Sequence, residues 1–205
     1  MCNAVVRDGR VPTDWKKSWM IPVYKGKGDA LECGSYRGIK LLDHVMKVLE
    51  RVLEARVRRR VNIDDMQFGF RPGRGTTDAI FIIRQIQEQF LAKKRELWFA
   101  FVDLEKAFDR VPRDAVWWAL RHVGVEEWII EVIKAMYAGA CTSVKLPDCE
   151  SQEFEVKVGV HQGSVFSTLL FIIVMQALSN NFKEGFSWEL LFADDLILVA
   201  ESEEK

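Results

Sequence analysis

The sequence predicts an α+β fold. Of its 205 residues, 49% are hydrophobic, which is typical of a folded globular chain and excludes a wholly disordered or collagen-like one. Some segments have apolar residues at helical spacing, whereas others have short continuous apolar runs that are typical of strands. Strand-like and helix-like segments do not alternate strictly along the chain, so we expect a mixed sheet packed with helices.

The first half of the chain is predicted to contain one strand and two helices. Residues 20–40 begin as a short strand and continue as a basic, glycine-rich loop. Residues 41–61 carry apolar side chains at helical spacing and have an arginine-rich polar face. After a loop at residues 68–75, Thr76 or its neighbour can cap a helix that ends near Lys94.

The second half is predicted to be richer in strands. A continuous apolar run at residues 97–103 indicates a buried strand that ends in an acid. Pro112 can open a helix that ends near His122. The remaining predicted elements are a helix at 126–138, strands at 142–146 and 154–158, an apolar helix from Gly163 to about Phe182, and strands at 188–193 and 196–200.

Charge is divided unevenly along the chain, although the net charge is only −1. Residues 1–95 contain 20 Lys and Arg against 11 Asp and Glu, and residues 96–205 contain 9 against 19. This division indicates that the first part contacts a polyanion and that the second part holds cations. Solvated helix faces alone would give a similar pattern and are the alternative interpretation.

Neither a signal peptide nor a transmembrane segment is predicted. The N-terminus has no apolar core, and the longest apolar stretch, near residues 165–178, is shorter than the roughly 20 residues that span a bilayer. Four cysteines without a CxxC pair, together with only three histidines, argue against a structural zinc site. We expect an intracellular protein with reduced thiols, in the nucleus or the cytoplasm.

Adjacent acids separate two strongly apolar runs near the C-terminus. The pattern predicts a hairpin whose two-residue loop is Asp194-Asp195. Two neighbouring carboxylates repel each other, and a bound divalent cation would relieve that repulsion. An exposed acidic turn without a ligand is the alternative.

A third acid, Asp103, ends the apolar run at residues 97–103, although it could simply cap the following turn. On neighbouring strands, Asp103, Asp194 and Asp195 could form a cluster of hard oxygen ligands suited to Mg²⁺ shared with substrate phosphates. Two such ions would activate a 3′-hydroxyl and stabilise a leaving pyrophosphate.

Six short motifs occur in order along nearly the whole chain. They are IPVYKGKGD at 21–29, YRGI at 36–39, FGFRPGR at 68–74, FVDLEKAFD at 101–109, GVHQGS at 159–164 and FADD at 192–195. In this order they resemble the reverse transcriptase domain of non-LTR (LINE-type) retrotransposons, with group II intron reverse transcriptases as more distant relatives.

The resemblance implies a right-hand polymerase with fingers at residues 1–95 and an incomplete palm at residues 96–205, whose antiparallel sheet packs on helices, and no thumb. It implies an RNA-directed DNA polymerase whose partners are an RNA template, a DNA primer and deoxynucleoside triphosphates, with no membrane involved. Because the chain ends ten residues after Asp195, we expect weak or no processive synthesis by this chain alone.

The resemblance also assigns roles to four residues in the second half. Asp103, Asp194 and Asp195 would be the catalytic residues and would bind two Mg²⁺ ions, which Mn²⁺ could replace. Phe108 falls on the steric gate, where its ring would collide with a 2′-hydroxyl and favour deoxynucleotides. Core packing is the alternative role of Phe108, and both roles could hold together.

Nucleotide binding is implied for four further residues. Lys25 and Arg37 match the basic residues of the fingers that hold the incoming triphosphate, since Lys supplies a point charge and Arg a bidentate contact. Gln162 and Gly163 match the segment that lies beside the nucleotide and the template. His161, in the same motif as Gln162 and Gly163, has no predicted special role.

Three residues depart from the pattern usual in the family. Phe166, Thr168 and Gln176 stand where Leu, Pro and Glu are common, and the loss of the proline leaves open how the helix begins and where Gln162 lies. Arg71 and Arg74 either contact the template backbone or are simply solvated.

Two other functions are compatible with these motifs. The alternative is a catalytically inactive, nucleic-acid-binding remnant of a retrotransposon polymerase. An RNA-dependent RNA polymerase is a third possibility, and both Phe108 and the Phe-Ala-Asp-Asp motif argue against it.

Overall fold

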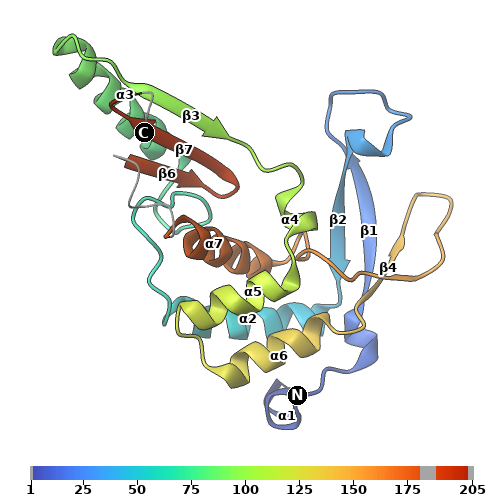
Figure 1. The fold of residues 1–205 in the computed structure, drawn as a ribbon. Coiled ribbons are helices and arrows are strands. Elements are labelled where there is room, and N and C mark those ends of the chain that lie inside the picture. Colours follow the sequence, from blue (N-terminus) through green and yellow to red (C-terminus); the bar gives the residue numbers. More distant parts are fainter. Residues whose placement is uncertain (1, 181–187, 203–205) are drawn as a thin grey trace.

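The structure is a computed structural model that describes residues 2–180 and 188–202 (Figure 1). Its helices are α1 (Cys2–Asp8), α2 (His44–Arg58), α3 (Thr76–Ala92), α4 (Ala107–Arg110), α5 (Arg113–His122), α6 (Glu127–Tyr137) and α7 (Val165–Ser179), with short 3-10 helices η1 (Thr13–Lys16) and η2 (Cys33–Ser35). Its strands are β1 (Lys17–Tyr24), β2 (Tyr36–Leu42), β3 (Trp98–Val102), β4 (Cys141–Val144), β5 (Phe154–Glu155), β6 (Trp188–Phe192) and β7 (Asp195–Ala200). Helices and two separate sheets confirm the predicted α+β class.

The first sheet has the strand order β2-β1-β4-β5. β1 pairs antiparallel with β2 from Ser18↔Leu42 to Tyr24↔Tyr36, and parallel with β4. The prediction of a single strand followed by a long loop is therefore wrong, because β2 forms within the expected loop. Gly38 weakens the strand signal locally, because glycine has no side chain to pack, but the seven-residue pairing with β1 outweighs it.

The second sheet is antiparallel and has the order β3-β7-β6. Phe192 pairs with Asp195 at the end of the β6–β7 hairpin. The two-residue loop is thus Ala193-Asp194, and the prediction of Asp194-Asp195 as the loop is wrong by one residue. Ala193 adopts the left-handed conformation with φ +58°, and Asp195 is the first residue of β7. Tertiary contacts to Ala193, described below, override the usual preference for glycine or aspartate in that conformation.

Helices cover both faces of this second sheet. On one face, Leu191 packs with Phe171 and Met175 of α7. On the other face, Leu190 packs with Ala79 of α3 and with Phe68. Leu190 and Leu191 are neighbours on β6 and therefore point to opposite faces, as the two-residue period of a strand requires.

β3 lies at the edge of the second sheet and is less buried than predicted. Phe101 is 72% exposed, and Trp98 and Val102 are also exposed. The prediction of a buried strand at this position is wrong, because β3 is an edge strand that pairs with β7 on one side only, and four of its five residues are exposed. A continuous apolar run signals a strand but does not by itself fix its burial.

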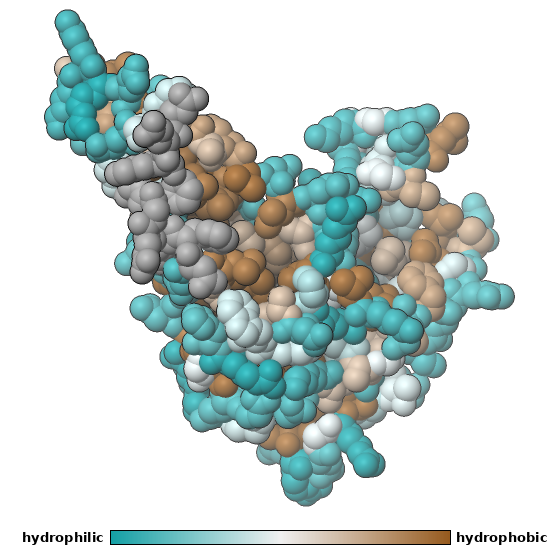
Figure 2. Space-filling model, viewed as in Figure 1, coloured by the Kyte–Doolittle hydropathy of each residue, from teal (hydrophilic) through white to brown (hydrophobic). Residues whose placement is uncertain are grey.

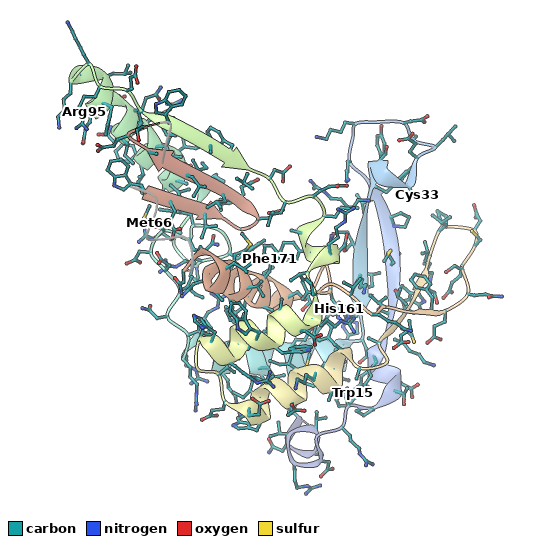
Figure 3. The ribbon with its side chains drawn as sticks, viewed as in Figure 1. Trp15, Cys33, Met66, Arg95, His161 and Phe171 are labelled. Carbon is teal, nitrogen blue, oxygen red and sulfur yellow. The ribbon has the colours of Figure 1, made fainter. Side chains whose placement is uncertain are left out.

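The main core lies between α2, α5, α6 and α7 (Figures 1 and 3). α7 is almost entirely buried, which explains why its sequence is apolar on every side. No helix in the described part of the chain is both long and apolar enough to cross a membrane. The predicted end of this helix at Phe182 lies outside the described residues.

Other helix boundaries agree with the sequence within a few residues. α2, α3 and α6 fall inside their predicted ranges, apart from small shifts at the ends. Pro112 is the N-cap of α5 and not its first helical residue. Asp43 caps α2 by accepting a hydrogen bond from the Val45 amide at 2.8 Å.

Glu50 is a buried acid on α2, only 2% exposed. Burial raises the pKa of Glu50 from an ordinary value of 4.5 to about 7, opposed by a hydrogen bond from Ser164 and by the charge of Lys47. The folded state therefore favours the neutral carboxyl. The contribution of Glu50 to stability is fully present below about pH 4.5 and is lost as the pH rises through about 7.

We predict that Glu50→Gln stabilises the protein at pH 8 by roughly 2 kcal/mol and has little effect at pH 5, because the amide keeps the neutral form at both values. Urea unfolding at the two pH values measures the difference. Glu88→Gln on the exposed face of α3 is the matched control, with no expected pH-dependent effect. An equal effect of Glu50→Gln at both pH values would contradict the prediction.

Candidate active site

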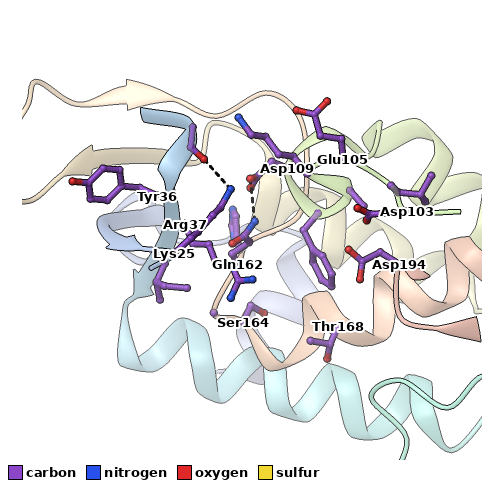
Figure 4. Close-up of a pocket in the computed structure, with 18 of the residues that line it drawn as sticks. Lys25, Tyr36, Arg37, Asp103, Glu105, Asp109, Gln162, Ser164, Thr168 and Asp194 are labelled. Carbon is purple, nitrogen blue, oxygen red and sulfur yellow. Dashed lines mark hydrogen bonds between the residues drawn. The ribbon is translucent and has the colours of Figure 1, made fainter. Parts of the chain in front are cut away.

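A cavity of about 710 Å³ opens between the β1–β2 hairpin, α4 and the β6–β7 turn (Figure 4). Figure 2 shows the corresponding hollow between the lobe that carries the second sheet and the lobe that carries β1 and β2. Seven of the eight predicted site residues line this cavity: Lys25, Arg37, Asp103, Phe108, Gln162, Gly163 and Asp194. Segments far apart in sequence thus meet at one site.

The β1–β2 hairpin supplies the basic side of the cavity. Lys25 follows β1, and its ammonium donates to the Gly34 carbonyl at 2.9 Å. Arg37 lies on β2, is exposed, and makes no ion pair within the described part of the chain. Lys27, which belongs to the IPVYKGKGD motif but was not among the predicted site residues, also lines the cavity. This side therefore presents several donors to an anionic ligand.

Asp103 and Asp194 lie on the opposite side of the cavity (Figure 4). Asp103 directly follows β3, and the pairing Val102↔Leu196 places it beside Asp195 on β7. Asp195 lines instead a smaller, mostly apolar cavity of about 280 Å³ on the α3 side of the sheet, together with Asp103.

The three acids interact electrostatically. Partial burial raises the pKa of Asp195, and the charges of Asp194 and Asp103 raise it further. Carboxylate oxygens are hard ligands, and a divalent cation bound between these acids would offset their repulsion. Within residues 2–180 and 188–202, however, no three His, Cys, Asp or Glu side chains are grouped closely enough to form a metal site as they stand.

The Phe108 ring is held between two other aromatic rings. It stacks on Phe171 of α7 with 4.4 Å between ring centroids, and the Phe70 ring meets it edge-on at 6.0 Å. Phe108 is half-buried and still lines the cavity. Core packing and a position at the cavity wall therefore coexist, and the packing fixes the orientation of the ring.

Residues 161–163 of the loop at 159–163 line the cavity. The Gln162 side chain donates to Asp109 at 3.0 Å, and the Gln162 carbonyl accepts from the Lys40 amide at 2.8 Å. Gly163 has φ +102°, and a Cβ there would lie 2.7 Å from the Lys40 carbonyl oxygen. Only glycine fits this close approach to β2.

The departure at Thr168 does not prevent α7 from forming. Ser164 caps the helix and accepts from the amides of Phe166 and Ser167 at 3.2 Å. Thr168 donates its hydroxyl to the Val165 carbonyl at 2.7 Å. Gln162 lies at the cavity wall although the usual proline is missing.

Gln176, where Glu is common, uses both ends of its amide. It accepts from the Asp64 amide at 3.2 Å and donates to the Asn62 carbonyl at 3.0 Å. An ionised glutamate could not donate the second of these bonds.

Arg71 and Arg74 bind their own loop. Arg71 donates to the Asp64 carbonyl at 2.6 Å and lies 3.4 Å from the Asp65 carboxylate. Arg74 lies over the Phe68 ring at 5.4 Å and 3.6 Å from Asp65. The loop that contains them is therefore held in shape by the arginines.

His161 has a structural role that the sequence did not reveal. It is 5% exposed, and its ring lies 4.5 Å from that of Tyr137 (Figure 3). Burial, together with the charges of Lys40 and Arg113, lowers the pKa of His161 to about 3. The imidazole is therefore neutral in the fold, and its apolar neighbours on α6 could only be identified in three dimensions.

Comparisons with known proteins agree with this geometry. The family model for reverse transcriptase (RNA-dependent DNA polymerase) matches residues 21–205. The RNA-directed DNA polymerase from mobile element jockey of Drosophila funebris is 27% identical over 98% of this chain, and the probable RNA-directed DNA polymerase from transposon X-element of Drosophila melanogaster is 30% identical over 98%. The chain spans 23% of the length of each of these relatives.

Solved structures show the same fold. Telomerase from Candida tropicalis, in complex with a fragment of telomeric RNA, superposes with a TM-score of 0.67 at 14% identity, covering 98% of this chain and 39% of that one. Telomerase from Candida albicans gives a TM-score of 0.65 at 12% identity, covering 95% and 40%. Together, the family match, the relatives and the fold establish that this chain belongs to the reverse transcriptase (RNA-dependent DNA polymerase) family and is related to the polymerases of non-LTR retrotransposons.

Proposed function

We propose that this chain forms the nucleotidyl-transfer site of an RNA-directed DNA polymerase, which adds deoxynucleotides to a primer 3′-end by a two-metal mechanism. One observation carries the proposal: a single cavity brings two cations of the β1–β2 hairpin opposite two carboxylates of the second sheet. A triphosphate needs cations at one end and metal-binding acids near its reacting phosphate.

The two sides of the cavity would divide the substrate between them. Lys25 and Arg37 would hold the triphosphate, and Gln162 and Gly163 would lie beside its base and the template. In this assignment residues 1–95 act as fingers and residues 96–205 as palm. Arg37 lines the cavity and has no ion pair among the residues that the structure describes, which supports a ligand-binding role, since a guanidinium forms bidentate phosphate contacts.

Asp103, Asp194 and Asp195 would hold two Mg²⁺ ions. When bound, such ions activate the primer 3′-hydroxyl and neutralise charge on the leaving pyrophosphate. The chain itself would position the reactants and would need no covalent nucleophile. Burial raises the pKa of Asp195, and the charges of Asp194 and Asp103 raise it further; a bound cation would relieve that repulsion, which supports this assignment.

Phe108 would act as the steric gate against ribonucleotides. Its ring lines the cavity and is clamped between Phe70 and Phe171, so it cannot swing away from a 2′-hydroxyl without disturbing the core. A rigid wall discriminates better than a mobile one, since moving it costs free energy for the wrong substrate. The RNA template and DNA primer are proposed partners, in keeping with the names of the relatives.

We predict that Asp103→Asn and Asp194→Asn each reduce single-deoxynucleotide incorporation on a primed RNA template at least about 10³-fold, because each removes a ligand charge. Both variants should unfold at the wild-type temperature, because both side chains line the cavity and neither belongs to the packed core. Mn²⁺ binding, measured by calorimetry without substrate, should weaken in parallel.

Asp14→Asn is the matched control, since the Asp14 side chain is 93% exposed and lies away from the cavity. Wild-type activity in either cavity variant would contradict the metal assignment. A wild-type chain that binds RNA and Mn²⁺ but incorporates no nucleotide would favour the inactive remnant.

We predict that Phe108→Val raises the ratio of ribonucleotide to deoxynucleotide incorporation by about 10- to 100-fold, because a smaller side chain leaves room for the 2′-hydroxyl. The measurement compares kcat/KM for the two nucleotides on the same primed template. Phe81→Val on α3, where the ring is 61% exposed, is the control. An unchanged ratio in Phe108→Val would remove the steric-gate role.

A further inference from the structure

The segment at residues 66–68 pairs with β6 and so extends the edge of the second sheet. The Phe68 amide donates to the Leu191 carbonyl at 2.8 Å, and the Leu191 amide donates to the Met66 carbonyl at 2.9 Å. Gln67 between them forms a parallel bridge with Leu191. Its side chain is completely buried, with an exposed fraction of 0%.

The side-chain oxygen of Gln67 accepts two hydrogen bonds. One comes from the Gly69 amide at 2.8 Å and the other from the Ala193 amide at 3.0 Å. Both partners are donors, so only the oxygen of the Gln67 amide can face them. The orientation of the side chain is therefore fixed by its contacts.

This orientation leaves the Gln67 side-chain nitrogen buried and without a hydrogen-bond partner among residues 2–180 and 188–202. A buried donor without a partner is destabilising. The Gln67 side-chain oxygen thus accepts two hydrogen bonds, whereas the nitrogen adds none to offset its burial. The geometry therefore indicates that the role of Gln67 depends on its acceptor oxygen beside the Gly69 and Ala193 amides.

The Ala193 amide belongs to the turn that carries Asp194. Ala193 has φ +58°, a left-handed conformation that is unfavourable for alanine. Gly69 packs directly on this turn, since a Cβ at Gly69 would lie 2.3 Å from the Ala193 nitrogen. The turn is therefore held from outside its own hairpin.

We propose that Gln67 is a positioning residue that fixes the Ala193-Asp194 turn, and with it the Asp194 carboxylate at the cavity. Gln67 contacts neither substrate nor the acids; it acts through the Ala193 amide. The consequence for catalysis rests on the proposed function, whereas the hold on the turn does not.

The test compares Gln67→Met, which keeps the size and removes the acceptor, with Gln67→Asn, which keeps the amide but shortens its reach. Gln176→Met is the matched control, because Gln176 also joins distant segments by two hydrogen bonds but lies away from the turn. The full chain is used throughout. Amide hydrogen exchange of Ala193, followed by NMR, is the first measurement.

We expect exchange of the Ala193 amide to be about tenfold faster in both Gln67 variants and unchanged in Gln176→Met. In single-nucleotide incorporation, kcat should fall at least about tenfold with little change in KM for the deoxynucleotide, because the triphosphate contacts on the β1–β2 hairpin are intact. Gln176→Met should keep the wild-type kcat even if its unfolding temperature falls by as much as that of the Gln67 variants.

Wild-type protection of Ala193 in the Gln67 variants, or a kcat loss equal to that of Gln176→Met, would overturn the proposal. Unfolding of both Gln67 variants would also overturn it, since Gln67 would then be a general structural residue. A wild-type chain that incorporates no nucleotide would overturn the proposed function alone, because Ala193 exchange tests the hold on the turn independently.

Discussion

The cavity depends on the close packing of the loop at residues 159–163 between β2 and α4. A Cβ at Gly159 would lie 2.5 Å from the Asp109 carbonyl oxygen, and one at Gly163 would lie 2.7 Å from that of Lys40. Backbone hydrogen bonds join the loop to Phe108 on one side and to Lys40 on the other. Because both contacts are backbone to backbone, the distance between the basic hairpin and Phe108 is set by main-chain geometry and not by flexible side chains.

Two polar side chains, those of Arg113 and His161, support this loop from the side of α6. Arg113 donates to the carbonyls of Gly159, Tyr137 and Val156, and its guanidinium lies 5.0 Å from the centroid of the Tyr137 ring. His161 packs on the same ring and is neutral, since burial and the neighbouring cations lower its pKa to about 3. A charged imidazole here would meet two positive charges, so its neutrality is a condition for the packing of the loop.

Much of the fold and of the cavity could be predicted from sequence, because helical spacing and the order of short motifs are local signals. Seven of the eight predicted residues line one cavity, and the helices α2, α3 and α6 lie where their apolar spacing predicts. β2 was missed because its pairing with β1 is a long-range contact that outweighs a glycine in its middle. The roles of Gln67 and His161 depend on groups about 126 and 24 residues away, and no local pattern encodes such contacts.

The one-residue shift of the hairpin loop has a consequence for how this chain can vary in length. Asp194 lies in the loop and Asp195 begins a strand whose next residues alternate between the α7 side and the α3 side of the sheet. Inserting or deleting one residue at the loop would carry Leu196 away from α7 and Ile197 away from α3, and would exchange the surroundings of the two acids. The spacing between Phe192 and Leu196 is therefore intolerant of single-residue insertions and deletions, although the hairpin tip is partly exposed to solvent.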